Sequence, residues 1–186
     1  MMEKKFGSTN RYLALLAGLT ALYVSYGYAS GVALQHNIRE LDLFFLISAL
    51  FTILVCLTGR PWSATILGTI NGLLLFGDPS APVGIGLSLI PNGLVFDMIG
   101  MGRSHPAENL SKNRLAIAGA LGNLAMGAAG VVIAISVGAL KTMGLPFIIS
   151  LLFALVGNPI VGALGALFGT IVVERVGEGV KSPLIH

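Results

Sequence analysis

Six long stretches without a charged residue constrain this chain more than any other feature. They run over residues 12–38, 43–59, 61–77, 79–96, 115–140 and 142–173. A helix of about 20 apolar residues, within a range of about 17–25, crosses the hydrocarbon core of a bilayer. Charged residues make up only 10% of the chain, against about 25% in a typical soluble domain. The sequence therefore predicts an all-α integral membrane bundle of six transmembrane helices.

We expect one domain, residues 1–186, because the predicted spans follow one another too closely for a second domain. The predicted helices cover about residues 12–34, 42–59, 61–77, 82–101, 112–140 and 145–174. The first uncharged run has 27 residues, which is too long for the apolar region of a typical signal peptide. We therefore expect this run to be retained as the first span.

The distribution of Lys and Arg predicts the orientation of the bundle. If six helices alternate in direction, nine of the eleven Lys and Arg residues fall on the side of the termini. Only Arg39 and Lys141 fall on the other side. Because cytoplasmic loops carry the excess of positive charge, we expect cytoplasmic termini and a multi-pass protein of the cell membrane. The same loop bias accounts for the net charge of +3 without a nucleic-acid partner.

Each of the last four predicted spans contains one asparagine beside Gly or Pro. These residues are Asn71, Asn92, Asn123 and Asn158. An amide that faces lipid has no hydrogen-bond partner, so we expect all four to face the bundle interior. They either bridge neighbouring helices or line a polar substrate cavity. Counted from the helix ends at about 1.5 Å per residue, they do not share one depth. We expect Asn71 and Asn92 to face an outward-opening pocket and to bind substrate, Asn158 to bind it from a lower position, and Asn123 to serve packing.

Polar and aromatic side chains also gather at the predicted outer end of the first helix. Tyr23 and Tyr26 are three residues apart and share a helix face. They either stack on a flat ligand ring or form an aromatic belt at the membrane surface. The loop over residues 35–42, QHNIRELD, is the densest outer polar cluster. Its candidate substrate-binding residues are Gln35, His36, Asn37 and Arg39.

Small residues spaced by four mark places where helices approach closely. The pairs Gly68/Gly72 and Gly165/Gly169 fit packing within the bundle. The first helix differs, because two such pairs overlap in its cytoplasmic half. They are formed by Ala14, Ala17, Gly18 and Ala21. This face fits either internal packing or contact with a separate membrane protein.

The chain resembles the substrate-binding S component of an energy-coupling factor (ECF) vitamin transporter. The resemblance rests on the number of helices, the predicted cytoplasmic termini, Ala17-x-x-x-Ala21, the segment IPNGLVFDMIG (90–100) and the Gly-rich sixth helix. It implies a subunit that captures a vitamin or a similar small organic molecule from outside, under the loop 35–42. It also implies that the alanine motif docks on a transmembrane coupling subunit that carries two ATPase subunits.

The sequence restricts the substrate only to a chemical class. The three His residues, at positions 36, 105 and 186, fall on different sides of the predicted membrane. This separation argues against a His-rich metal site, so we expect an organic substrate and no bound metal or cofactor. The chain has no Walker-type phosphate loop, so ATP would act on the partner subunits.

Two other functional classes deserve comparison with substrate capture. The segment Gly86-Leu87-Ser88-Leu89 matches the GxSx pattern of rhomboid proteases. A serine nucleophile needs a base, and no predicted span places a His near Ser88, so we do not expect an enzyme. A stand-alone secondary transporter or a membrane assembly factor is the alternative, although the two halves show no convincing inverted repeat.

Overall fold

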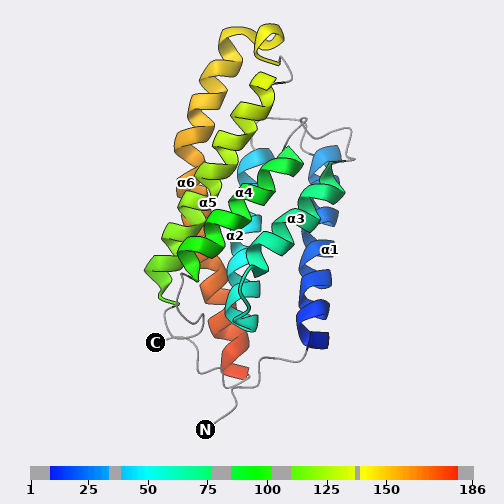
Figure 1. Cartoon of the computed structure of the whole chain (residues 1–186), viewed down its shortest axis with the longest axis vertical. Coiled ribbons are helices and arrows are strands. Elements are labelled where there is room, and N and C mark those ends of the chain that lie inside the picture. Colours follow the sequence, from blue (N-terminus) through cyan, green and yellow to red (C-terminus); the bar gives the residue numbers. More distant parts are fainter. Residues whose placement is uncertain (1–8, 34–38, 77–84, 102–109, 137–138, 180–186) are drawn as a thin grey trace.

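The computed structural model describes residues 9–33, 39–76, 85–101, 110–136 and 139–179 (Figure 1). Every element in these ranges is an α-helix, as predicted. The helices are α1 (Thr9–Ala33), α2 (Arg39–Thr58), α3 (Ser63–Leu75), α4 (Ile85–Gly100), α5 (Lys112–Ser136) and α6 (Ala139–Gly179).

Four of the helices are long and apolar enough to cross a membrane. The apolar stretches are Thr9–Ala29, Leu41–Thr58, Lys112–Ile133 and Leu155–Val176. The helix Ser63–Leu75 and the segment Gly86–Gly100 are apolar but shorter. The structure therefore confirms an all-α protein with several helices fit for a membrane, whereas the count of six spans is still a prediction.

Several helix boundaries differ from the predicted ones, and two of these differences have a clear physical reason. The segment 140–145, expected as an outer loop, lies within α6, which begins at Ala139. The loop was predicted there because Lys141 interrupts the uncharged sequence. A charged side chain does not by itself end a helix, because the backbone groups of the helix still bond to one another. The helix α3 begins at Ser63 rather than at residue 61, because Gly59 (φ 59°) and Trp62 (φ 63°) turn the chain between α2 and α3.

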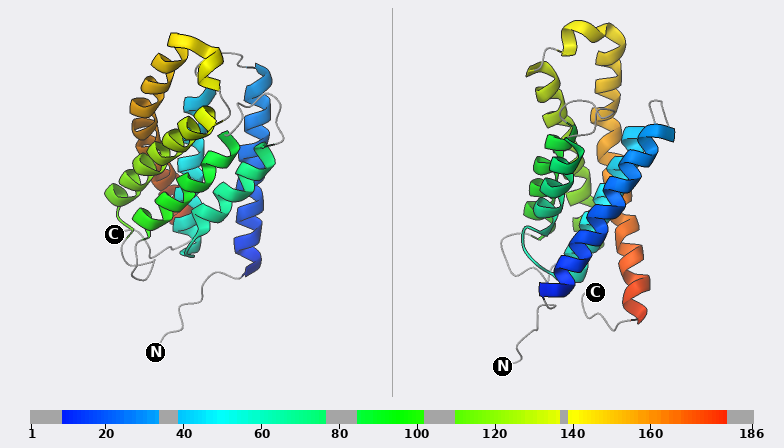
Figure 2. Two further views of the ribbon diagram at one scale, coloured as in Figure 1. Left: turned by 45° about the horizontal axis from the view of Figure 1, so that its top comes forward. Right: turned by 90° about the vertical axis from the view of Figure 1, so that its right-hand side faces the viewer.

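Five of the helices form a continuous group, and α1 lies at its edge. α3 packs on α4, α4 on α5, α5 on α6, and α6 on α2. The main contacts of α1 are with the neighbouring helices α2 and α3 (Figure 2). Only 17% of the span Thr9–Ala29 is buried, against 67% of the span Leu41–Thr58. α1 is therefore the most exposed of the four membrane-length helices.

Glycines bring the helices of this group into close contact. Gly119 on α5 meets the carbonyl of Gly162 on α6, and Gly165 on α6 meets the carbonyl of Phe45 on α2. Gly72 on α3 meets the carbonyl of Gly86 on α4 in the same way. A side chain at any of these contacts would overlap the facing backbone. The internal packing predicted for the glycine pairs of α3 and α6 is confirmed.

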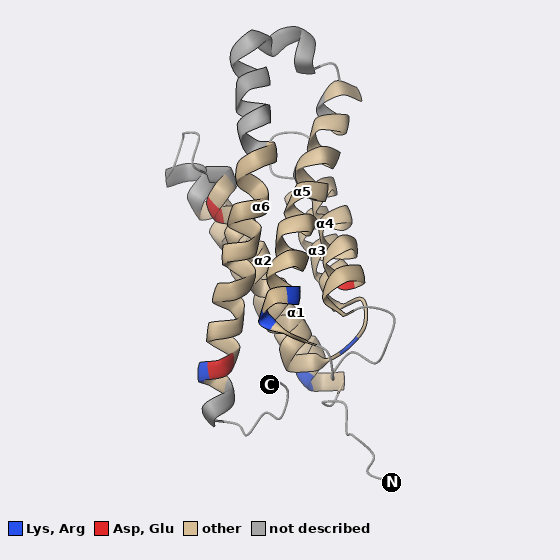
Figure 3. Ribbon diagram, turned by 90° about the vertical axis from the view of Figure 1, so that its left-hand side faces the viewer, with Lys and Arg blue, Asp and Glu red and all other residues tan. Residues whose placement is uncertain are grey.

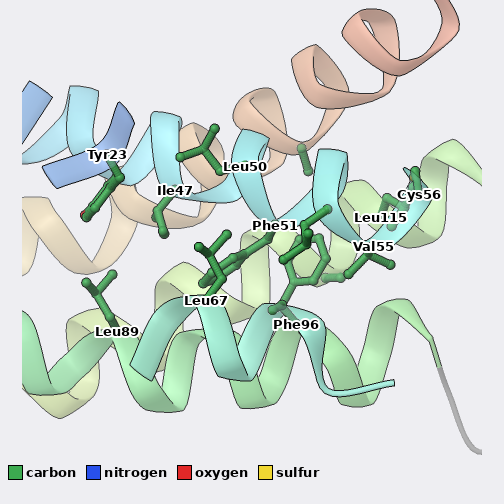
Figure 4. Packing of buried hydrophobic residues seen from close by; sticks show 14 of the residues in the cluster. Tyr23, Ile47, Leu50, Phe51, Val55, Cys56, Leu67, Leu89, Phe96 and Leu115 are labelled. Carbon is green, nitrogen blue, oxygen red and sulfur yellow. The ribbon is translucent and has the colours of Figure 1, made fainter. Parts of the chain in front are cut away.

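Aromatic and aliphatic side chains fill the space between the layers of helices (Figure 4). Phe51 of α2 and Phe96 of α4 meet edge to face, with ring centroids 5.5 Å apart. Cys56 is buried in the same cluster as a free thiol, as expected for a packing residue. Because lipid is as apolar as these side chains, close packing rather than exclusion of water stabilises such contacts in a bilayer.

The Lys and Arg residues coloured blue in Figure 3 lie toward one end of the bundle, in the lower half of the view. This is the end where α1 begins and α6 ends. One ion pair joins Lys112 on α5 to Glu174 on α6, with Nζ and Oε1 2.6 Å apart. The clustering of positive charge at one end agrees with the bias read from the sequence.

Candidate functional site

Asn123 on α5 joins four helices through its side-chain amide. Its Nδ2 donates hydrogen bonds to the backbone carbonyls of Phe44 on α2 and Asn158 on α6, each at 3.2 Å. Its Oδ1 accepts hydrogen bonds from Asn92 Nδ2 on α4 (3.0 Å) and Ser48 Oγ on α2 (3.2 Å). Two donors and two acceptor positions are all that an amide offers. Asn123 therefore has the packing role that the sequence predicted.

Asn92 and Asn158, both expected to bind substrate, belong to this Asn123 network. Both residues are buried, and the Oδ1 atom of each lacks a hydrogen-bond partner among the described residues. The prediction that the asparagines lie at different depths is wrong for Asn92, Asn123 and Asn158, which are joined by hydrogen bonds. The predicted depths were counted from the helix ends, on the assumption that all helices end at the same height. In the folded bundle the helices are shifted and tilted relative to one another, so this assumption does not hold.

Asn71 on α3 and Tyr23 on α1 lie outside the Asn123 network. Both side chains are fully buried (0% exposed). The amide oxygen and nitrogen of Asn71 have no hydrogen-bond partner among the described residues. The same is true of the Tyr23 hydroxyl. A methyl group added to Gly27 of α1 would lie 3.4 Å from Leu75 Cδ2 of α3. Tyr23 on α1 and Asn71 on α3 each lie four residues before this contact, so both residues are close to where α1 and α3 meet.

Tyr26, the second tyrosine predicted to contact the substrate, has a different environment from Tyr23. Tyr26 is exposed, and its hydroxyl donates a hydrogen bond of 2.6 Å to Asp42 Oδ2 on α2. Tyr23 instead points into the core, in the space between helices that Figure 4 shows. The two rings thus do not form one continuous stacking surface, because residues three apart diverge by about 60° around a helix of 3.6 residues per turn.

The remaining predicted substrate contacts belong to the segment 35–42 between α1 and α2. Gln35, His36 and Asn37 lie outside the described residues. Arg39 begins α2, but its side chain is outside the described part of the chain. A substrate site under the segment 35–42 is therefore still a prediction.

The four predicted partner contacts on α1 are all exposed. They are Ala14, Ala17, Gly18 and Ala21. A side chain added to Gly18 would meet nothing within 4 Å. An apolar groove of about 630 Å³ runs between α1 and α3 along one side of this face. It is lined by residues such as Ala17 and Ala21 on α1 and Ile70 and Leu74 on α3. The small-residue face of α1 is thus unused by the described part of the bundle.

Asp97 lies near the C-terminal end of α4. It was not predicted as a site residue, although a single carboxylate within an apolar helix can be recognised in the sequence. It is buried and accepts hydrogen bonds from the backbone N–H groups of Ala64 (3.3 Å) and Thr65 (2.7 Å). Thr65 Oγ1 donates a third hydrogen bond at 2.7 Å. Asp97 therefore holds the beginning of α3 and is occupied by structural bonds.

Comparisons with protein-family models, with curated proteins and with solved structures return no match. The site is therefore assigned from the geometry of the chain itself. Two features stand out: the unpaired polar pair Tyr23 and Asn71, and the exposed small-residue face of α1.

Proposed function

We propose that the chain is the membrane-embedded substrate-capture subunit of an ECF-type transporter. In this proposal it crosses the cell membrane six times with cytoplasmic termini and binds a vitamin-like small organic molecule from outside. A transmembrane coupling subunit with a pair of ATPase subunits supplies the energy for uptake. The chain itself performs no chemical reaction.

The observation that carries this proposal is the exposed small-residue face of α1. Gly165 on α6 and Gly72 on α3 meet the backbone of a neighbouring helix, whereas a methyl group at Gly18 on α1, as at Gly130 on α5, would meet nothing within 4 Å. Around Gly18, the small residues Ala14, Ala17 and Ala21 are exposed as well. Small residues allow two helix backbones to approach, and this close packing drives association within a membrane. An exposed small-residue face on a peripheral helix is therefore suited to a partner helix, as the resemblance to S components implies.

The lengths of α3 and α4 fit six spans if their flanking segments contribute. At about 1.5 Å per residue, the 13 residues of α3 and the 16 residues of α4 reach about 20 and 24 Å. The hydrocarbon core of a bilayer is about 30 Å thick. Local thinning or the neighbouring residues would cover the difference at modest cost. The positive charge at the end where α1 begins supports cytoplasmic termini.

Co-purification tests the docking half of the proposal. The chain is expressed with the coupling subunit and the ATPase pair from its own genome, as wild type and as the double variant Ala14→Trp/Gly18→Trp. We expect at least a tenfold loss of associated ATPase in the variant, because two indoles block close approach of a partner helix. Ile117→Trp, at an exposed position on α5, is the matched control and should keep the complex.

Mass spectrometry of small molecules retained by the purified chain tests the capture half. We expect a stoichiometric organic molecule in the wild type and an equal amount in Ala14→Trp/Gly18→Trp, because these two positions do not line the groove between α1 and α3. An intact complex in the double variant would rule out α1 as the docking helix. Substrate uptake into vesicles by the chain alone would identify the stand-alone transporter instead.

A further inference from the structure

Unpaired buried polar groups concentrate where α1 meets α3. Among the described residues, the buried side-chain atoms without a hydrogen-bond partner belong to Thr20, Tyr23, Asn71, Asn92 and Asn158. The last two residues belong to the Asn123 network, whereas the first three lie on α1 and α3. Each unpaired buried group costs roughly 1–3 kcal/mol, and a bilayer supplies no water to offset that cost.

Packing does not explain why Tyr23 and Asn71 are polar. The contact of α3 with α4 is made by Gly68 and Gly72, which meet the carbonyls of Leu89 and Gly86. A leucine has the same branched shape as an asparagine, although a larger volume, and would occupy position 71 without leaving an unpaired amide. The polarity of this pair therefore points to a hydrogen-bond partner that is not part of the described chain.

The element that would open this interface is α1. Tyr23 and Asn71 are fully enclosed, so a ligand can reach them only if one helix moves. α3 is fixed to α4 by backbone contacts at its glycines, whereas only 17% of the span Thr9–Ala29 is buried. The 630 Å³ groove, lined in part by Thr20 and Ile70, already lies between the two helices. Displacement of α1 from α3 would extend this groove to the polar pair.

The chemistry of the pair defines what it recognises. Asn71 offers two donors and an acceptor, and the Tyr23 hydroxyl offers one donor and accepts. Tyr23 shares its core cluster with Ile47, Leu67 and Leu89, so the surroundings are apolar. Asp42, on the neighbouring helix α2, is near enough to interact electrostatically with Tyr23. Both of its carboxylate oxygens, however, already accept hydrogen bonds, from the Tyr26 hydroxyl and from the Leu43 backbone N–H. A charged ligand buried against neutral groups would lack a counter-ion, at a large cost.

We infer that Tyr23 and Asn71 form the recognition site for a small, uncharged molecule with an amide, lactam or ureide edge, bound between α1 and α3. The molecule places its polar edge on the pair and its apolar body against the aliphatic walls. This inference rests on the proposed capture function and narrows its substrate to a neutral class. It also assigns recognition to α1 and α3 rather than to Asn92 and Asn158.

The test uses the full chain in lipid nanodiscs. Small molecules retained after purification are quantified by mass spectrometry in the wild type, Tyr23→Phe and Asn71→Leu. Binding is also titrated with two matched probe pairs, nicotinamide against nicotinate and uracil against its 6-carboxylate. Tyr28→Phe, an exposed hydroxyl on the same helix, is the control. We expect each site variant to retain at least tenfold less ligand with an unchanged or higher thermal midpoint, while the control retains the wild-type amount.

The outcomes separate this inference from the proposed function. Equal retention in Tyr23→Phe and Asn71→Leu would overturn the site but leave the capture function standing. Retention of an anion or cation, or tenfold preference for the carboxylate probes, would overturn the neutral class. A wild-type chain that retains no molecule and binds no probe would overturn the capture function and the site together.

Discussion

The carboxylate of Asp97 on α4 caps the first turn of α3 through Thr65. Its Oδ2 accepts hydrogen bonds from the Thr65 backbone N–H and from Thr65 Oγ1, each at 2.7 Å. The residue that precedes α3, Trp62, has a positive φ and provides no side-chain cap. The first N–H groups of a helix have no partner within it and favour negative charge. The cap of α3 therefore comes from another helix.

Removal of this cap should destabilise the bundle. We expect Asp97→Ala to lower the free energy of unfolding by about 1–3 kcal/mol, because it leaves buried backbone N–H groups unpaired. Asp97→Asn should cost less, since one acceptor oxygen is kept. Thermal unfolding in detergent, followed through the fluorescence of Trp62, the only tryptophan, measures both. An Asp97→Ala midpoint equal to that of the wild type would contradict the capping role.

Two asparagines should respond in opposite ways to the same substitution. Asn123→Leu removes four hydrogen bonds that join α2, α4, α5 and α6, and we expect a loss of at least about 2 kcal/mol. Asn71→Leu removes an amide without partners and should leave stability unchanged or raise it. Thermal midpoints of the two variants in the same detergent make the comparison. Equal losses would show that Asn71 also has a structural partner.

Glycine substitutions should separate internal contacts from the open face of α1. Gly165→Ala places a methyl group against the Phe45 carbonyl, and overpacking of this kind costs about 1–3 kcal/mol. Gly18→Ala meets open space and should leave the thermal midpoint within one degree or raise it slightly through helix propensity. The thermal midpoints of the two variants are measured and compared, and Gly165→Ala should have the lower one. A Gly18→Ala variant as unstable as Gly165→Ala would mean that α1 packs more closely than described.

The N-terminal end of α1 is held by Arg60, which follows α2. Its Nη2 donates to Thr9 Oγ1 at 3.3 Å, and its guanidinium lies 4.7 Å from the centroid of the Tyr12 ring. An exposed cation–π contact contributes about 0.5–1 kcal/mol. We expect Arg60→Gln to speed hydrogen exchange in the first turns of α1 by about two- to fivefold. Arg175→Gln on α6 is the control, and equal exchange in both variants would count against this anchor.

The sequence predicted the elements of the site better than their connections. Uncharged runs predicted helices, and the cost of an amide in lipid placed all four asparagines inside, where the structure has them buried. The overlapping small-residue pairs of the first helix predicted a distinctive face, and Ala17 and Gly18 are indeed exposed. These inferences succeeded because each depends on local composition and on spacing along one helix.

Only the tertiary structure decided which asparagine bridges and which is unpaired. Asn123 bonds to Phe44 and Asn158, 79 and 35 residues away, and Asp97 caps a helix that begins 34 residues before it. Such contacts depend on how far each helix is rotated and tilted against its neighbours. Hydropathy and periodicity leave rotation and tilt undetermined. They are set by the glycine contacts, which fix where two backbones meet and therefore which polar side chains face one another.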